Sequence, residues 1–292
     1  MKEQFIDERQ YKKHLYRILK FFISICEKHN LTYCCATGTM LGAVRHNDII
    51  PWDDDVDVFM PRKDYEQLLT IAEEIESDGF GLISAKNCFS YATFAKLYYK
   101  NTTLWEMESI PFVYGVYIDI FPLDETDDDR KTFRKKYRYF RNLFRKYQLS
   151  QMKFSLKRLL RNIKEGDTKM ALKDLLSIFV PACMSDHYRM KIVQFEKEAA
   201  SGVGNHLVSY YGDYWEKEYF DKKWFEVFIN MPFSDFTVKV PKGYQEYLTN
   251  VYGDYMKFPP VEKRTSHHYH YYLNMDKGMG IEEVRKVMKR NS

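Results

Sequence analysis

The sequence contains no stretch that approaches 18 apolar residues, and its first four residues lack the basic-then-apolar layout of a signal peptide. Its five cysteines make an odd number and include no C-x-x-C pair and no zinc-type spacing. The adjacent Cys34 and Cys35 fall in an expected strand, so we interpret them as small core residues. These absences argue against a membrane-spanning, disulfide-stapled or zinc-binding chain, and they predict a reducing, cytoplasmic location.

Acidic residues are missing from one long segment. Between Arg130 and Lys164 the chain has 14 Lys and Arg residues but no Asp or Glu, within a protein of net charge +4. A segment with charge of one sign is the surface best suited to an anionic partner.

Apolar and aromatic residues are abundant. Hydrophobic residues make up 45% and aromatic residues 17% of the 292 residues, which is typical of a folded globule. This length allows one large domain or two small ones. Most of the 24 tyrosines and 21 phenylalanines are expected in the core, and a few are candidates for a cation-binding cage.

Two aspartates alternate with valines in the segment 55–59. If this segment is a strand, Asp55 and Asp57 project from one face about 7 Å apart, while the valines enter the core. A bound Mg²⁺ or Mn²⁺ is the usual way to stabilise two carboxylates so close together. For Asp53 and Asp54 a solvated turn is an equal alternative.

A Gly-Thr pair precedes these acids by about fifteen residues. Gly38 allows close approach of the backbone to a phosphate, and Thr39 is expected to cap a short helix through Val44 whose N-terminus faces it. Arg45 either stabilises substrate charge or neutralises the acidic residues. Together these features predict metal-assisted phosphoryl transfer.

A third carboxylate lies on another expected strand, over 116–120. Two-metal sites take a third acidic ligand from a neighbouring strand, and Asp119 is the candidate, with a second role in removing a hydroxyl proton. The alternative is a buried aspartate that bonds to the backbone.

The pattern of periodicity predicts an α/β (α+β) fold, a mixed sheet flanked by helices with a helical insertion. We expect 1–125 and 203–292 to build the catalytic part, 126–202 to be a basic helical subdomain, and 202–214 to be a loop that reaches back over the site. The expected helices cover 8–30, 65–77, 169–179, 184–200, 244–252 and 281–289, and the expected strands cover 31–36, 82–84, 91–99, 225–229 and 236–240.

An aromatic stripe marks the start of the basic segment, at Phe133, Tyr137, Phe140, Phe144 and Tyr147. The first interpretation is a core-facing helix with a solvated basic back. The second is a surface over 130–164 that contacts an anionic membrane or a lipid-diphosphate-linked glycan.

Four stretches resemble a known family. The stretches 38–46 and 50–57 are similar to the signature of the LicD family of bacterial phosphocholine transferases, relatives of fukutin and fukutin-related protein. The stretches 116–124 and 252–268 match further motifs, whereas 126–202 matches none.

This resemblance implies a nucleotidyltransferase-like fold that moves phosphocholine from CDP-choline to a hydroxyl of a cell-surface glycan, releasing CMP. The acceptor would be a lipopolysaccharide, teichoic acid or capsule precursor, including lipid-linked forms, and no nucleic acid is expected as a partner. The resemblance also matches Asp119 to the third acidic residue of the family. The protein would then act in the cytoplasm, at the inner face of the membrane if 130–164 contacts it.

The predicted site contains two sets of residues. The catalytic and metal-binding residues are Asp55, Asp57 and Asp119, with Mg²⁺ or Mn²⁺. The substrate-binding residues are Gly38, Thr39, Arg45, His46, Trp52, Asp53, His267 and His268. The candidate walls for a choline cage are Trp52, Trp105, Tyr117 and Tyr211.

Three alternatives stay open. The same acids would serve a nucleotidyltransferase that acts on a small molecule. A related enzyme would transfer phosphoethanolamine or aminoethylphosphonate from a cytidylyl donor. A non-catalytic module would bind an anionic glycan or membrane through the basic segment, with structural acids.

Overall fold

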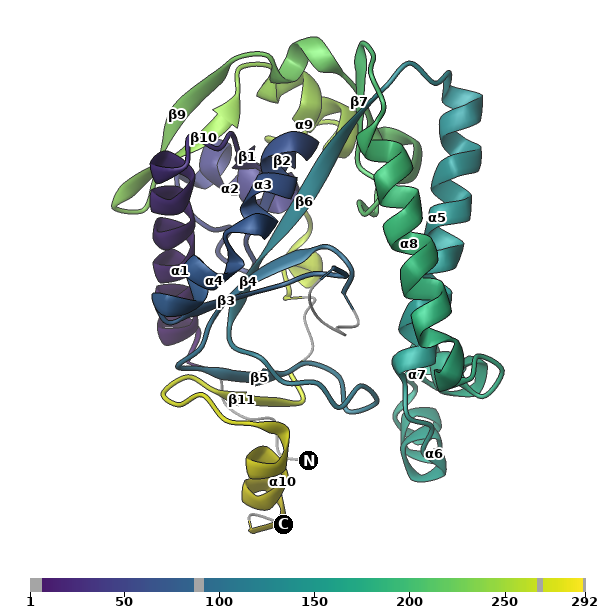
Figure 1. The fold of residues 1–292 in the computed structure, drawn as a ribbon. Coiled ribbons are helices and arrows are strands. Elements are labelled where there is room, and N and C mark those ends of the chain that lie inside the picture. Colours follow the sequence, from purple (N-terminus) through teal and green to yellow (C-terminus); the bar gives the residue numbers. More distant parts are fainter. Residues whose placement is uncertain (1–6, 87–91, 267–269, 291–292) are drawn as a thin grey trace.

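The computed structural model describes residues 7–86, 92–266 and 270–290. Strands occupy the centre, with α1 (Glu8–Lys28) on one side and the upright pair α5 (Arg130–Gln151) and α8 (Ser185–Ala200) on the other (Figure 1). The α/β class with a mixed sheet and flanking helices is therefore confirmed.

The main sheet connects seven strands within the described ranges. Its order is β1-β2-β6-β4-β3, and the far end of the long strand β6 pairs with β7, which pairs with β8. Strands β2 and β6 are parallel, and the other pairs are antiparallel. The strands are β1 (Cys34–Cys35), β2 (Asp57–Pro61), β3 (Phe80–Ile83), β4 (Ala95–Tyr99), β6 (Tyr117–Thr126), β7 (His206–Val208) and β8 (Tyr219–Asp221).

Helix α1 begins where the sequence predicts a helix. The Asp7 side chain caps it by accepting the N–H groups of Arg9 and Gln10. Its apolar face, including Leu15 and Phe22, is fully buried and contacts β4 and β6. Burial of such side chains stabilises by roughly 1.5–3 kcal/mol each, so this face anchors the helix to the sheet.

The predicted helix over 65–77 is wrong in its extent. The chain forms α3 (Arg62–Thr70) and α4 (Ala72–Ser77), separated by Ile71, whose backbone is not helical. Helix α3 starts directly after Pro61, because proline's fixed φ suits a helix entry.

Several strand boundaries also differ from prediction, and the predicted strand 225–229 falls across η3 (Lys222–Phe225) and the start of β9 (Phe228–Phe233). Strand β1 covers two residues of the predicted 31–36, and β2 begins at Asp57, two residues later than expected. The reason at β2 is a turn in which the Asp53 N–H donates to the Ile50 carbonyl at 2.9 Å. The core positions were predicted correctly, because Val56 and Val58 are buried.

The basic segment forms a helix with its aromatic stripe inward. The Asp129 carboxylate caps α5 by accepting the Thr132 N–H at 2.7 Å. The five stripe residues are buried against α8 and the tyrosines of 210–219. The first interpretation of this stripe, a core-facing helix, is therefore confirmed.

The remaining elements complete the chain. Helices α6 (Leu156–Glu165) and α7 (Thr168–Ser177) lie between α5 and α8, inside the predicted helical segment 126–202; as a domain division, 1–125, 126–202 and 203–292 stays a prediction. The others are α2 (Thr37–His46), β5 (Thr103–Trp105), η1 (Ala182–Met184), η2 (Trp215–Glu218), η3 (Lys222–Phe225), β9 (Phe228–Phe233), β10 (Phe236–Pro241), α9 (Tyr244–Tyr252), η4 (Val261–Lys263), β11 (Tyr272–Asn274) and α10 (Ile281–Arg290).

Candidate active site

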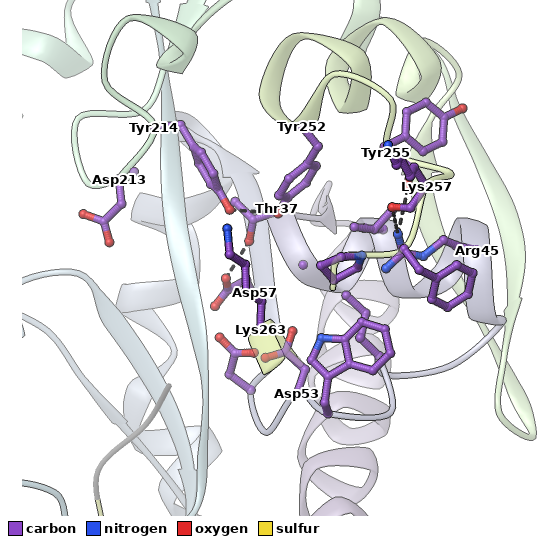
Figure 2. A pocket seen from close by; sticks show the side chains of 18 of the residues that line it. Thr37, Arg45, Asp53, Asp57, Asp213, Tyr214, Tyr252, Tyr255, Lys257 and Lys263 are labelled. Carbon is purple, nitrogen blue, oxygen red and sulfur yellow. Dashed lines mark hydrogen bonds between the residues drawn. The ribbon is translucent and has the colours of Figure 1, made fainter. Parts of the chain in front are cut away.

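A pocket of about 670 Å³ brings distant parts of the chain together. Its walls come from the start of α2, the turn 50–57, the loop 209–214 and the segment 252–265 (Figure 2). The predicted reach of the 202–214 segment over the site is thus confirmed, since five of its last six residues line this pocket, although residues 206–208 form β7 and not loop.

Asp57 stands at the centre of this arrangement. Its Oδ2 accepts a hydrogen bond from the Thr37 hydroxyl at 2.6 Å, and its backbone N–H donates to Thr39 Oγ1 at 2.8 Å. Its carbonyl accepts the Ala36 N–H at 2.9 Å. These bonds from one helix entry fix the carboxylate with one edge in the pocket.

The N-terminus of α2 also faces the pocket. Its first two residues, Thr37 and Gly38, line the wall, and the N-cap Ala36 has no side-chain oxygen to satisfy the first N–H groups. This end carries the positive pole of the helix dipole and suits a phosphate. A Cβ on Gly38 would lie 3.0 Å from Asp53 Oδ2, so glycine here keeps room for that carboxylate.

Thr39 does not cap α2 as predicted. Thr39 is 5% exposed, lies inside the first turn of α2, and is absent from the pocket wall, so its substrate role stays a prediction. The N-cap is Ala36, three residues earlier than predicted. The Thr39 hydroxyl instead holds the Asp57 backbone, which is a structural function.

Three successive carboxylates could hold a cation. Oxygens of Asp53, Asp54 and Asp55 lie within 4.8 Å of one another, and this is the cluster of three found among the described residues. Asp53, Asp55 and Asp57 line the pocket, while Asp54 accepts from the Ser266 hydroxyl at 2.5 Å. Several hard oxygen donors at this spacing fit Mg²⁺ or Mn²⁺.

Asp119 lies beside Asp57, as the sequence predicted. The parallel register pairs these two residues, but the Asp119 side chain is 12% exposed and its Oδ1 accepts from Lys96 Nζ at 2.7 Å. Asp119 is not part of the pocket wall. Its place in a metal site stays a prediction, because the structure brings it next to the acids without joining it to their cluster.

Lys96 is a residue that the sequence analysis missed. It pairs with Asp119 across β4 and β6, and its ammonium lies 3.5 Å from the centre of the Tyr117 ring. Burial lowers the pKa of Lys96, while Asp119, Asp57 and Asp55 oppose that shift. The sequence did contain a signal for Lys96, because it is a lysine at a core-facing position of an alternating strand. A charge at such a position needs buried acidic partners.

Arg45 lies in the pocket wall, and hydrogen bonds to other parts of the protein orient its guanidinium. Its guanidinium donates to the Tyr255 carbonyl at 2.7 Å, and its Nε donates to His46 Nε2 at 3.0 Å. Burial, followed by the nearby Arg45 charge, lowers the pKa of His46 and favours the neutral ring that accepts this bond. His46 itself is not in the wall but supports Arg45, and its predicted substrate contact stays a prediction.

Trp52 also lines the pocket, together with Phe258. The Arg45 and Arg264 guanidiniums lie over both rings, at 4.8–6.0 Å from the ring centres. These rings therefore already contact cations of the chain itself.

A second pair of rings lies above Asp57. Tyr214 and Tyr252 meet edge to face with ring centres 5.4 Å apart, and their hydroxyls are 3.0 Å apart (Figure 2). Burial raises the pKa of Tyr214 to about 12, and the Glu218 and Asp57 carboxylates add to this shift. Both rings are therefore neutral, apolar walls beside a carboxylate.

Two of the four candidate cage residues are elsewhere. The buried Trp105 donates its Nε1–H to the carbonyls of Met107 and Ile110, and Tyr117 donates to Glu106 at 2.5 Å. Neither lines the pocket. The sequence positions of Trp105 and Tyr117 could not predict this placement, because the register of the sheet decides on which of its faces each side chain lies.

The predicted substrate residues His267 and His268 lie outside the described residues. Their neighbours Lys263 and Thr265 line the pocket, as does Lys257. Arg45, Lys257 and Lys263 thus place positive charge in the same cavity as the Asp53–Asp57 segment (Figure 2). Opposed charges of this kind suit a diphosphate with its cation.

A buried carboxyl supports the loop that carries Tyr214. Glu218 is fully buried, its Oε1 accepts the Tyr214 N–H at 3.0 Å, and its Oε2 has no hydrogen-bond partner among the described residues. A Cβ at Gly212 would overlap this carboxyl, so the loop can pass only because glycine is there. Glu218 is therefore a positioning residue for one wall of the pocket.

Replacement of Glu218 by glutamine is expected to remove a pH-dependent loss of stability. Burial raises the pKa of Glu218 to about 8, so the folded protein binds this proton more tightly than the unfolded chain. Wild-type stability then falls as the pH rises from about 4.3 to about 8, by at most about 1.4 kcal/mol per pH unit. Urea unfolding at several pH values measures this slope.

The exposed Glu226 provides the matched control for that experiment. Glu226→Gln should leave the pH profile of unfolding unchanged, whereas Glu218→Gln should flatten it. Parallel profiles for wild type and Glu218→Gln would contradict the assigned burial of this carboxyl.

The parallel β2–β6 pair, with its acids, an adjacent helix N-terminus and a pocket for charged groups, defines a nucleotidyltransferase-like enzyme. Comparison with known proteins identifies the family. The family model described as "LicD/FKTN/FKRP, nucleotidyltransferase domain" matches residues 30–159. The chain is 30% identical over 255 residues to the lipopolysaccharide cholinephosphotransferase LicD of Haemophilus influenzae, covering 86% of this chain and 92% of that protein.

Two shorter matches agree with this result. An uncharacterized protein of Rickettsia prowazekii is 39% identical over 66 residues, covering 23% of this chain and 25% of that protein. One of Rickettsia typhi is 30% identical over 132 residues, covering 43% of this chain and 39% of that protein. The chain belongs to the LicD family, and it is an enzyme of the transferase class.

Helices within the described part of the chain are too short or too polar to cross a bilayer.

Proposed function

We propose that this enzyme transfers phosphocholine from CDP-choline to a hydroxyl of a cell-surface glycan, with release of CMP. The observation that carries the proposal is a single pocket that joins clustered carboxylates, cationic side chains and a pair of neutral tyrosines. It occurs in a chain related over most of its length to a lipopolysaccharide cholinephosphotransferase. Because CDP-choline is a cytoplasmic nucleotide, the proposal includes a cytoplasmic site of action.

Asp53, Asp55 and Asp57 would hold Mg²⁺ or Mn²⁺ in this proposal, with Asp119 as a further candidate. A divalent ion there would neutralise charge that develops on the transferred phosphoryl group. The Thr37 hydroxyl holds Asp57 in place by donating to its Oδ2, and Asp57 lines the pocket.

The positively charged groups of the pocket bind the donor. Arg45, Lys257 and Lys263 supply charge to the diphosphate, and the N–H groups at the start of α2 supply hydrogen bonds. Arg45 is suited to this task because His46 and the Tyr255 carbonyl already orient its guanidinium. The Arg45 side chain is therefore already oriented before the donor binds, which lowers the entropic cost of binding.

The reaction transfers one group. The acceptor oxygen attacks the phosphorus that bears choline, the bond from that phosphorus to the CMP oxygen breaks, and CMP leaves. The hydroxyl proton passes to a carboxylate of the Asp53–Asp57 segment. Asp119 is less suited to this step than expected from the sequence, because Lys96 occupies its Oδ1 and it does not reach the pocket wall.

Tyr214 and Tyr252 are the proposed walls for the trimethylammonium group. A quaternary ammonium donates no ordinary hydrogen bond, so aromatic faces and a nearby negative charge recognise it. The two rings and Asp57 provide both. Trp52 is less suitable, because Arg45 and Arg264 already lie over its ring.

The experiment that tests this function follows CMP release from CDP-choline with Mg²⁺ and a panel of glycans. Wild-type protein should release CMP only with an acceptor, and chelation of the metal should stop it. CDP-ethanolamine in place of CDP-choline tests the head group. Absence of CMP release, with ATP or CTP consumed instead, would contradict the proposal and favour a nucleotidyltransferase.

A further inference from the structure

The helical hairpin formed by α6 and α7 buries polar side chains between its helices and exposes apolar side chains to solvent. Between its helices lie charged and amide side chains: Arg158 is 5% exposed, and Asp174 is fully buried. Arg158 Nε donates to Asp174 Oδ1 at 3.0 Å, and Asn162 Nδ2 donates to Asp174 Oδ2 at 3.0 Å. Polar groups thus hold the two helices together where apolar residues usually do.

The outward face of the same hairpin is apolar. Leu156, Leu160 and Ile163 follow one another at helical spacing along α6, and each is about 60% exposed. Helix α7 also exposes apolar side chains, and Phe179, just beyond its end, is 80% exposed. The other exposed apolar residues of the hairpin are Phe154, Leu172, Leu175, Leu176 and Ile178.

This face is a local feature and not an extension of the core. Figure 1 shows α6 and α7 at the lower end of the α5–α8 pair, where they project beyond the strands. The neighbouring helix α5 has normal polarity, with its aromatic stripe buried. Monomeric proteins rarely expose a contiguous apolar patch of this extent unless something covers it.

Positive charge borders the apolar face. Lys153, Lys157, Lys164 and Lys169 are exposed along the hairpin. Of its acids, Asp174 is enclosed by Arg158, Glu165 lies 3.9 Å from Arg161, and the exposed Asp167 caps α7 by accepting the Met170 N–H. Exposed lysines next to exposed leucines are the pattern of surfaces that enter the headgroup region of anionic bilayers.

We propose that the α6–α7 hairpin, residues 153–179, is a membrane-docking element that inserts its apolar face into an anionic lipid surface. The buried Arg158–Asp174 pair holds the helices in register, so the leucines can leave water together without loss of the fold. This inference does not depend on the phosphocholine donor. It locates membrane contact at this hairpin, whereas the aromatic stripe of α5 is unavailable to lipid because it is buried.

Charge favours lipid over a second copy of the chain as the occupant. A symmetric contact of two hairpins would bring the same lysines against each other, and like charges disfavour such a contact. Acidic lipid headgroups complement these lysines, and the acyl chains accept the leucines.

The test is flotation of the full-length protein with vesicles of phosphatidylglycerol and phosphatidylethanolamine, and with neutral phosphatidylcholine vesicles. Wild-type protein should float with the anionic vesicles and at least about fivefold more weakly with the neutral ones. Leu160→Ser with Leu176→Ser should lower the partition coefficient by about tenfold for each leucine. Lys157→Gln with Lys164→Gln should lower it by about fivefold for each lysine.

Val203→Ser with Val227→Ser is the matched control, because both valines are exposed and lie outside the hairpin. This variant should bind vesicles as wild type does. Thermal unfolding should be unchanged in the leucine variant, since its altered side chains are exposed. The vesicles contain no CDP-choline, so this result and the result of the CMP assay are independent.

Vesicle binding that is absent in wild type, or equal in wild type and the leucine variant, overturns the proposal. A concentration-dependent dimer that the leucine variant abolishes, with no vesicle binding, also overturns it and assigns the face to a second copy of the chain. Light scattering after size-exclusion chromatography distinguishes this outcome.

Discussion

Replacement of Asp57 by asparagine is expected to reduce CMP release by about 10³-fold, the size of loss that follows removal of one charge-stabilising group in phosphoryl transfer. The substitution removes a negative charge and changes little else. Thr37 can donate to the amide oxygen as it donates to Oδ2, and the bonds of the Asp57 backbone to Ala36 and Thr39 remain. The loss should therefore appear in turnover and in metal affinity and not in folding.

The measurement is initial-rate CMP release over a range of Mg²⁺ concentrations, with thermal unfolding as the check on the fold. Asp235→Asn is the matched control, because Asp235 is exposed at the β9–β10 turn and pairs only with Lys20 among the contacts described. That variant should retain wild-type activity. An Asp57→Asn enzyme within about tenfold of wild type would exclude this carboxylate from the reaction.

Replacement of Arg62 by methionine is expected to destabilise the protein by about 3–5 kcal/mol. Arg62 lies on α3, is buried, and donates to both oxygens of the buried Asp124 on β6 at 2.7 and 2.9 Å. It also lies 3.5 Å from the buried Glu196 on α8. Methionine fills much of the same space but leaves two buried carboxyls without their cation, and a marginally stable fold tolerates such a loss poorly.

The deficit should be larger at alkaline than at acidic pH. Burial raises the pKa of Glu196 to about 7 even with Arg62 opposing the shift, so its proton is bound more tightly in the folded state. Stability from this group falls as the pH rises from about 4.3 to about 7, and loss of Arg62 extends that fall to higher pH. Urea unfolding near pH 5 and near pH 8 tests this difference, because it measures the free energy of unfolding to within about 1 kcal/mol.

A second variant separates the ion pair from the packing. Arg62→Met combined with Asp124→Leu should recover much of the stability, because an apolar pair of similar volume needs no solvation. Arg285→Met, in an exposed pair with Glu282, should change stability by less than about 1 kcal/mol. A loss of similar size in Arg62→Met and Arg285→Met would contradict the central position assigned to Arg62.

The buried ion pair of Arg62 and Glu196 also supports one wall of the pocket. Tyr211 lines the pocket wall, its hydroxyl donates to Glu196 at 3.1 Å, and it accepts from Thr93 at 2.9 Å. Arg62, Glu196 and Tyr211 come from three parts of the chain. Loss of Arg62 should therefore also loosen this wall, which a rise in KM for the donor would reveal.

Local chemistry determined what the sequence alone predicted correctly. The helix over 244–252 has its predicted bounds in α9, because apolar periodicity is set by residues within a few turns of one another. Asp55 and Asp57 reach a common pocket because they are two residues apart. The family resemblance was also recognisable from the sequence, because its motifs are short contiguous stretches.

Tertiary structure alone decided the residues that act across long separations. Lys96 meets Asp119 because β4 pairs with β6, and Tyr214 meets Tyr252 because a loop returns to the sheet edge. Thr39 and His46 lie within the motif yet are absent from the pocket wall, since a helix turns successive residues about 100° apart. In α6 and α7, packing around Asp174 turned the apolar side chains outward, because a buried charge must keep its partners inside.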